Sequence, residues 1–195
     1  IVVLLGGIIG AELAPSPGLA TLPVALMILG TAASTIPASF LMRRFGRRKG
    51  FLFAASYAVV AGLLGAFAIQ TAAFWLLCIA TFLIGSHNAF VQQYRFAVAE
   101  SVPAARLGRS LSVLMLAGVV AAYLGPKTAT LLQGLVPGAV YVGSFLGLSV
   151  LMAGAGTVLS FYVPDQRETE VGGQGGRSLW QIAQQLDFKI AIVAS

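Results

Sequence analysis

Charged residues are absent from two long stretches of the chain, residues 13–42 and 50–94, and apolar residues dominate both. Lipid tails solvate apolar side chains directly, whereas a soluble domain needs charges on its surface. Polar, Pro and Gly breaks divide the chain into apolar runs, and about 20 such residues span a bilayer. The pattern predicts six membrane spans, at residues 1–13, 20–42, 50–69, 73–94, 110–133 and 139–163.

The overall composition supports an all-α membrane protein built as a six-helix bundle. The chain is 58% hydrophobic and 9% charged, against roughly 25% charged residues in an average soluble domain. The net charge of +6 does not indicate a nucleic-acid partner, because the charges are few and lie at the predicted helix ends. The single cysteine, Cys78, excludes an internal disulfide and a cysteine-based metal cluster.

The position of the basic residues predicts the orientation of the spans. Residues 43–49 carry five positive charges in seven residues, and residues 95–109 carry three arginines and one glutamate. Loops rich in Lys and Arg stay in the cytoplasm. We therefore expect both segments to be cytoplasmic, in a multi-pass protein of the plasma (inner) membrane. The intervening loops predicted on the outer side carry no Lys or Arg.

The distribution of apolar runs also predicts three regions. Residues 1–163 form the transmembrane bundle, and we expect its first span to begin before Ile1. Residues 164–189 read as a cytoplasmic linker with a Gly-rich stretch and an amphipathic helix at the membrane surface. Residues 190–195 read as the start of a seventh span.

A polar stripe marks the span 73–94. Its members recur at intervals of three and four residues and so share one helix face: Thr81, Gly85, Asn88, Gln92 and Arg95. Polar groups in lipid need partners, so this face points into protein or into a water-filled cavity. The stripe is either one wall of a substrate path, through Thr81, His87, Asn88 and Gln92, or a set of helix–helix hydrogen bonds.

His87 flanks the stripe and has two interpretations. Its reference pKa near neutrality suits a proton relay, but a lone histidine is also a common packed, hydrogen-bonded residue. No second His, Cys or carboxylate lies at ligand spacing, so the sequence predicts no metal site. The chain has no Gly-x-Ser-x-Gly, no His-Glu-x-x-His and no phosphate-binding Gly loop, so we predict no enzyme activity and no cofactor.

The segment between the second and third spans resembles a motif of the major facilitator superfamily, Gly-x-x-x-Asp-Arg-x-Gly-Arg-Arg/Lys. Arg44, Gly46, Arg47 and Arg48 match it, whereas Arg43 stands where the family has an acid. Residues 103–109 are similar to the family's Pro-x-x-x-Arg-Gly-Arg stretch. Residues 125–126, Gly-Pro, look like the core of a motif in its antiporters.

The resemblance implies the N-terminal half of a twelve-helix fold. It also implies a secondary active transporter that moves a small solute by alternating access, with the solute bound between two halves. The partners would be the solute, a coupling proton or cation, the lipid bilayer and the C-terminal half of the same protein. Within this interpretation, Arg44, Gly46, Arg47 and Arg48 control the conformational equilibrium. The alternative is a protein of the same fold that scaffolds or senses without transport.

Glu12 and Lys127 are the charges predicted within a span or at its edge, both near the outer face. An unpaired charge in hydrocarbon costs a few kcal/mol. The two side chains either form an outer charge pair, since the family fold implies that their spans are neighbours, or reach water separately.

Overall fold

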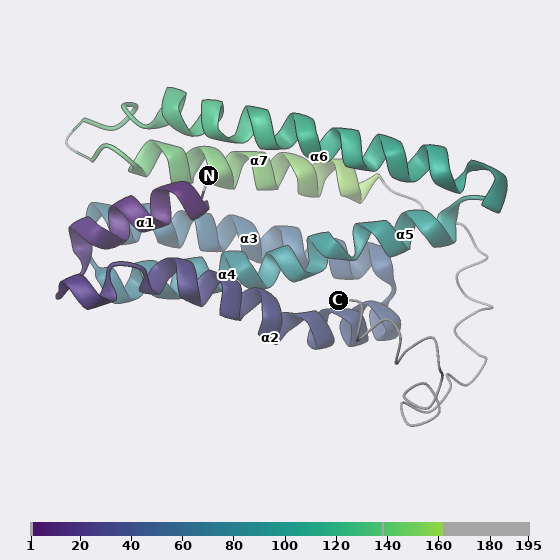
Figure 1. Cartoon of the computed structure of the whole chain (residues 1–195), viewed down its shortest axis with the longest axis horizontal. Helices are drawn as coiled ribbons and strands as arrows, with labels where there is room; N and C mark the ends of the chain where they lie inside the picture. Colours follow the sequence, from purple (N-terminus) through teal and green to yellow (C-terminus); the bar gives the residue numbers. More distant parts are fainter. Residues whose placement is uncertain (1, 138, 162–195) are drawn as a thin grey trace. The chain divides into compact units, whose positions relative to one another are not determined.

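The computed structural model describes residues 2–137 and 139–161, and helices joined by short turns make up the described chain (Figure 1). The elements are α1 Val2–Leu13, the 3₁₀ turn η1 Pro17–Leu19, α2 Leu22–Phe45, α3 Arg47–Gln70, α4 Phe74–Gln92, α5 Tyr94–Ser101, α6 Ala104–Leu132 and α7 Val142–Ser160. Each of the six predicted spans corresponds to one of these helices, and α5 extends α4. The all-α prediction is confirmed.

Five of the helical segments are long and apolar enough to cross a bilayer. They comprise α2 with η1, α3, α4 continued through α5, α6, and α7. With 12 residues, α1 is about 18 Å long, which is shorter than the hydrocarbon core of about 30 Å. The chain is a multi-pass integral membrane protein.

The structure corrects the extent of both basic loops. Residues 43–49 are helical except at Gly46, where α2 ends and α3 begins. Residues 95–109 consist mainly of α5 and the first turns of α6, with only a short break at 102–103. Charge shows where a chain leaves the apolar layer, but a helix continues into water for as long as its backbone bonds are satisfied.

Helices α2 and α4 pack closely because small residues let their backbones approach. A Cβ at Gly85 would collide with the Met27 carbonyl oxygen, and one at Gly30 would collide with that of Phe82. Hydroxyls bridge the same seam: Thr31 Oγ1 donates to the Gly85 carbonyl at 2.9 Å, and the Ser34 and Ser86 hydroxyls are 2.6 Å apart.

Helices α3 and α7 form the other close pair, side by side in Figure 1. Gly62 and Gly65 of α3 leave room for the Ser149 hydroxyl and the Phe145 ring of α7. Phe145 lies at the centre of an apolar cluster that also takes residues from four other helices, namely Leu5, Ile9, Ala66, Ala68, Leu77 and Ala129. This cluster fixes the ends of α1, α3, α4, α6 and α7 that lie away from the basic segments.

The predicted linker with its amphipathic helix, residues 164–189, and the predicted start of a seventh span, residues 190–195, lie outside the described residues. Their assignments stay predictions.

Candidate functional site

The predicted polar stripe, which runs along α4 to Arg95 in the first turn of α5, divides into a buried part and an exposed part. Thr81 is fully buried and donates to the Cys78 carbonyl of its own helix, and Gly85 lies against the α2 backbone. Asn88, Gln92 and Arg95 are exposed. We call these three residues the polar row. The two ends of the stripe therefore have different surroundings although they share one helix face.

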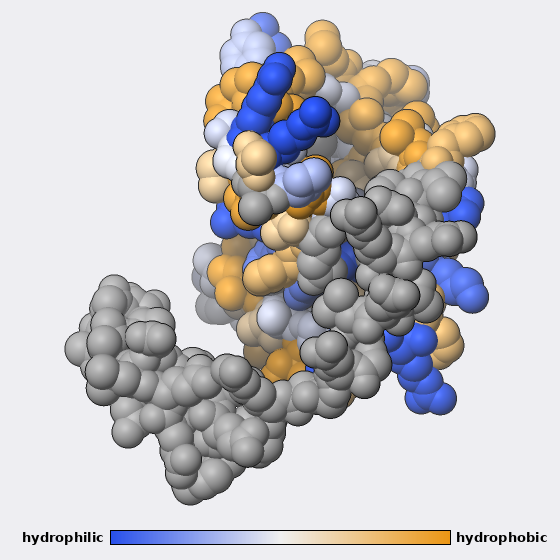
Figure 2. Space-filling model, turned by 90° about the vertical axis from the view of Figure 1, so that its right-hand side faces the viewer, coloured by the Kyte–Doolittle hydropathy of each residue, from blue (hydrophilic) through white to orange (hydrophobic). Residues whose placement is uncertain are grey.

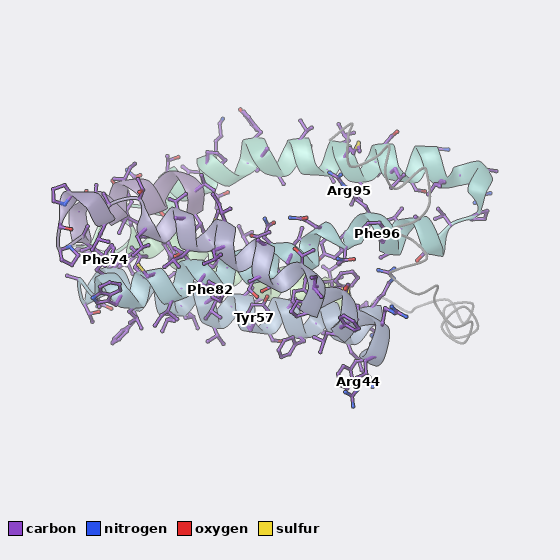
Figure 3. All side chains as sticks on the ribbon, turned by 60° about the horizontal axis from the view of Figure 1, so that its bottom comes forward. Arg44, Tyr57, Phe74, Phe82, Arg95 and Phe96 are labelled. Carbon is purple, nitrogen blue, oxygen red and sulfur yellow. The ribbon has the colours of Figure 1, made fainter. Side chains whose placement is uncertain are left out.

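His87 lies on a different face of the bundle from the polar row. Its Nδ1 is 3.1 Å from the Ala54 carbonyl oxygen of α3, and its ring meets the Tyr57 ring edge-on at 6.2 Å between centroids. Figure 3 shows Tyr57 among the helices of the bundle. The structure thus gives His87 the contacts of a packed, hydrogen-bonded residue, and it does not place His87 beside Asn88 or Gln92.

The hydroxyls of α2 are candidate site residues that the sequence interpretation missed. Thr35 is exposed and Ser39 is half-buried, and each donates within its own helix, to the Thr31 and Ile36 carbonyl oxygens. Their spacing with Thr31 and Ser34, at intervals of one, three and four residues, was the available signal. A hydroxyl bonded to its own helix remains able to accept a hydrogen bond from a solute.

Gly46 forms the sharp junction between α2 and α3. Its φ of 84° and ψ of 155° are a conformation in which an L side chain is strained. A Cβ at Gly46 would have no atom within 4 Å, so the backbone angles and not the neighbours favour glycine here. A junction of one residue brings the basic end of α2 directly against the basic start of α3.

Two arginines of the basic segment make defined contacts. Arg48 Nη2 donates to the carbonyl oxygen of Ser160, the last residue of α7, at 2.5 Å. The final carbonyls of a helix lack intrahelical partners and carry partial negative charge, so a guanidinium stabilises them. The Arg44 guanidinium lies 5.5 Å from the centre of the Phe45 ring, and Arg44 projects from the end of α2 in Figure 3. Figure 2 looks onto this end of the bundle, where strongly hydrophilic residues gather in patches.

Glu12 and Lys127 are both exposed. Lys127 Nζ lies 4.9 Å from the centre of the Tyr123 ring on its own helix. Helices α1 and α6 both contribute residues to the apolar cluster around Phe145. An ion pair between Glu12 and Lys127 is not among the contacts of the described residues, and the predicted pair stays a prediction.

Within the described residues, no group of three or more His, Cys, Asp or Glu side chains could hold a metal ion. The candidate site is therefore built from amide, hydroxyl and guanidinium groups.

Comparison with known families decides the class of the protein. The protein-family model described as "Major Facilitator Superfamily" matches residues 1–190. The chain belongs to this superfamily. A curated relative, the riboflavin transporter RfnT of Brucella anthropi, is 40% identical over 151 residues, which cover 77% of this chain and 38% of the relative. No solved structure shows significant similarity to the chain.

The chain spans well under half of the relative that it matches. Membership in the Major Facilitator Superfamily and this relative both point to a transporter and not to an enzyme. Neither comparison supports a scaffold or sensing role.

Proposed function

We propose that the chain forms the N-terminal half of a secondary transporter that moves a small solute by alternating access. The second half of the same protein would complete the solute site. The observation that carries the proposal is the polar row, because Asn88 and Gln92 are exposed on a helix that crosses the bilayer. An amide side chain facing lipid would lack hydrogen-bond partners, so a water-filled path is the environment that suits it.

The hydroxyls of α2 extend the polar row into a surface. Helices α2 and α4 run in the same direction, since α3 returns between them (Figure 1). Around the axis of α4, Asn88 and Gln92 lie about 70–110° from the side that faces α2. Around the axis of α2, Thr35 and Ser39 lie at a similar angle from the side that faces α4, in the opposite sense of rotation. These opposite rotations place the four side chains on one side of the α2–α4 pair, where a solute could contact all of them.

Riboflavin is the first solute to test, because the relative is named as its transporter. Riboflavin combines a planar ring edge of donors and acceptors with a chain of hydroxyls. Two amides and two hydroxyls on one surface offer both donors and acceptors to such a solute. The proposal predicts that the full-length protein in proteoliposomes exchanges labelled riboflavin against unlabelled riboflavin inside.

Counterflow also separates transport from the alternative role, because a scaffold or sensor would not exchange solute. Asn88→Ala and Gln92→Ala should each reduce riboflavin binding roughly 5- to 30-fold, as expected for losing one or two hydrogen bonds of about 1 kcal/mol. Gln70→Ala is the matched control, because Gln70 is an exposed amide at the far end of α3. Equal effects at all three positions would argue against the polar row as part of the solute site.

The basic segment would set the balance between the two access states. Arg48 connects the start of α3 to the end of α7, and α7 leads directly toward residues 164–189. In this proposal the contact forms in one access state and breaks in the other, with Gly46 as the junction that moves. Arg44 and Arg47 belong to the same proposal through the family motif.

We place residues 43–49 and 95–109 on the cytoplasmic side of the plasma membrane, supported by the positive charge of both segments. A proton or cation would drive the solute, and His87, on another face of α4, would be the proton carrier. Glu12 and Lys127, both exposed, would form a charge pair at the outer mouth, as the neighbouring spans of the family fold imply.

A further inference from the structure

A groove opens between α5 and α6, at the end of the bundle that carries the basic segments. Its volume is about 910 Å³, and its walls are largely apolar, with Phe51, Val98, Leu114 and Leu159 among the residues that line it. Along α6 it extends from Arg106 to Ala117, which is about 16 Å. This length is close to one leaflet of a hydrocarbon core of about 30 Å.

Positive charge is concentrated at one end of the groove. Arg106 and Arg109 line it from the first turns of α6, and both are exposed. The N-terminus of α6 adds partial positive charge, because its cap residue, Pro103, offers no side-chain hydrogen bond to the free N–H groups.

We propose that this groove binds an anionic phospholipid of the cytoplasmic leaflet. The phosphate would lie against Arg106 and Arg109, whose guanidinium groups match phosphate oxygens in bidentate geometry. One acyl chain would lie along Leu114 and Ala117. A soluble anion would use the arginines but not the apolar walls, and a neutral apolar ligand would use the walls but not the arginines. An anionic lipid satisfies both parts of the groove.

The proposal rests on the cytoplasmic placement of residues 95–109 and does not require transport activity. The test is lipid binding to the full-length protein by native mass spectrometry, with phosphatidylglycerol and phosphatidylcholine as the probes. Each basic residue near an anionic surface contributes about fivefold to binding, so Arg106→Gln with Arg109→Gln should weaken phosphatidylglycerol binding about thirtyfold. Phosphatidylcholine binding should change little.

A matched double variant, Arg43→Gln with Lys49→Gln, removes the same charge from exposed positions outside the groove. This control should retain nearly all phosphatidylglycerol binding. If it loses as much as the groove variant, the attraction is a general effect of surface charge, and the lipid site is refuted.

The apolar part of the groove is tested separately. Leu114→Trp fills the groove and should displace the bound lipid without changing any charge. Leu116→Trp is the control, because Leu116 is exposed on the same helix and does not line the groove. A photo-crosslinking residue in place of Val98 should capture phosphatidylglycerol. Capture of another segment of the same protein, or of riboflavin, would identify a different occupant and overturn the proposal.

Discussion

Gly46 offers a sharp test of the junction between α2 and α3. Replacing Gly46 with alanine adds one methyl group where no neighbouring atom lies within 4 Å, so no steric contact opposes the change. The cost comes from the backbone, because φ of 84° with ψ of 155° lies in a region that is essentially restricted to glycine. A residue held in such a region costs about 1–3 kcal/mol.

The expected loss is measurable by thermal unfolding of the purified full-length protein. A change of 1 kcal/mol shifts Tm by about 2–4 °C for a domain of 150–250 residues, so Gly46→Ala should lower Tm by about 2–12 °C. Gly118→Ala is the matched control, since Gly118 lies within α6 and its Cβ would also meet open space. Alanine in a helix is favoured over glycine by about 0.5–1 kcal/mol, so this variant should keep or raise Tm.

The transport arm of the same experiment uses a larger residue. Gly46→Leu should reduce riboflavin counterflow while the amount of protein inserted in the membrane stays near the unmodified level. If Gly46→Ala and Gly118→Ala have the same Tm, and Gly46→Leu transports normally, then the positive φ at Gly46 does not constrain the junction and the reasoning fails.

Three further predictions address other parts of the molecule. In intact cells, a cysteine at Lys49 should be protected from an impermeant thiol reagent and one at Pro17 should react; the reverse pattern would contradict the proposed topology. Gly85→Val should destabilise the α2–α4 seam by about 1–3 kcal/mol, because its Cβ meets the α2 backbone, and an unchanged Tm would show that the seam is looser than described. Glu12→Gln and Lys127→Met should each impair counterflow while the double variant recovers part of the loss, whereas additive losses would mean that the two charges do not interact.

Hydropathy alone was sufficient to predict the class, and each predicted span corresponds to a helix, five of which are long and apolar enough to cross a bilayer. A bilayer imposes a length and an apolar composition on each crossing helix, and both are properties of local sequence. The ends of the helices were harder to predict. Residues 95–109 contain arginines and Pro103, which mark departure from the apolar layer, yet the helices continue there as α5 and α6. Charged residues indicate where the chain leaves the membrane, but they do not indicate its backbone conformation.

The candidate site was only partly predictable because burial depends on neighbours. Helical spacing placed Thr81, Asn88 and Gln92 on one face, but it could not show that Thr81 is buried while the other two are exposed. The surroundings of His87 likewise depend on a distant residue, because its Nδ1 contacts the carbonyl oxygen of Ala54, 33 positions earlier in the sequence. Such contacts follow from how helices pack, and no local pattern encodes them.

The most direct measurement is the water accessibility of position 88 in the full-length protein. Asn88→Cys should react rapidly with a water-soluble thiol reagent, and added riboflavin should slow the reaction. Val60→Cys, on an exposed apolar position of α3, should react slowly with or without riboflavin because it faces lipid. Buried Cys78 should contribute little background. Equally slow labelling at positions 60 and 88, unaffected by riboflavin, would contradict a solute path along α4.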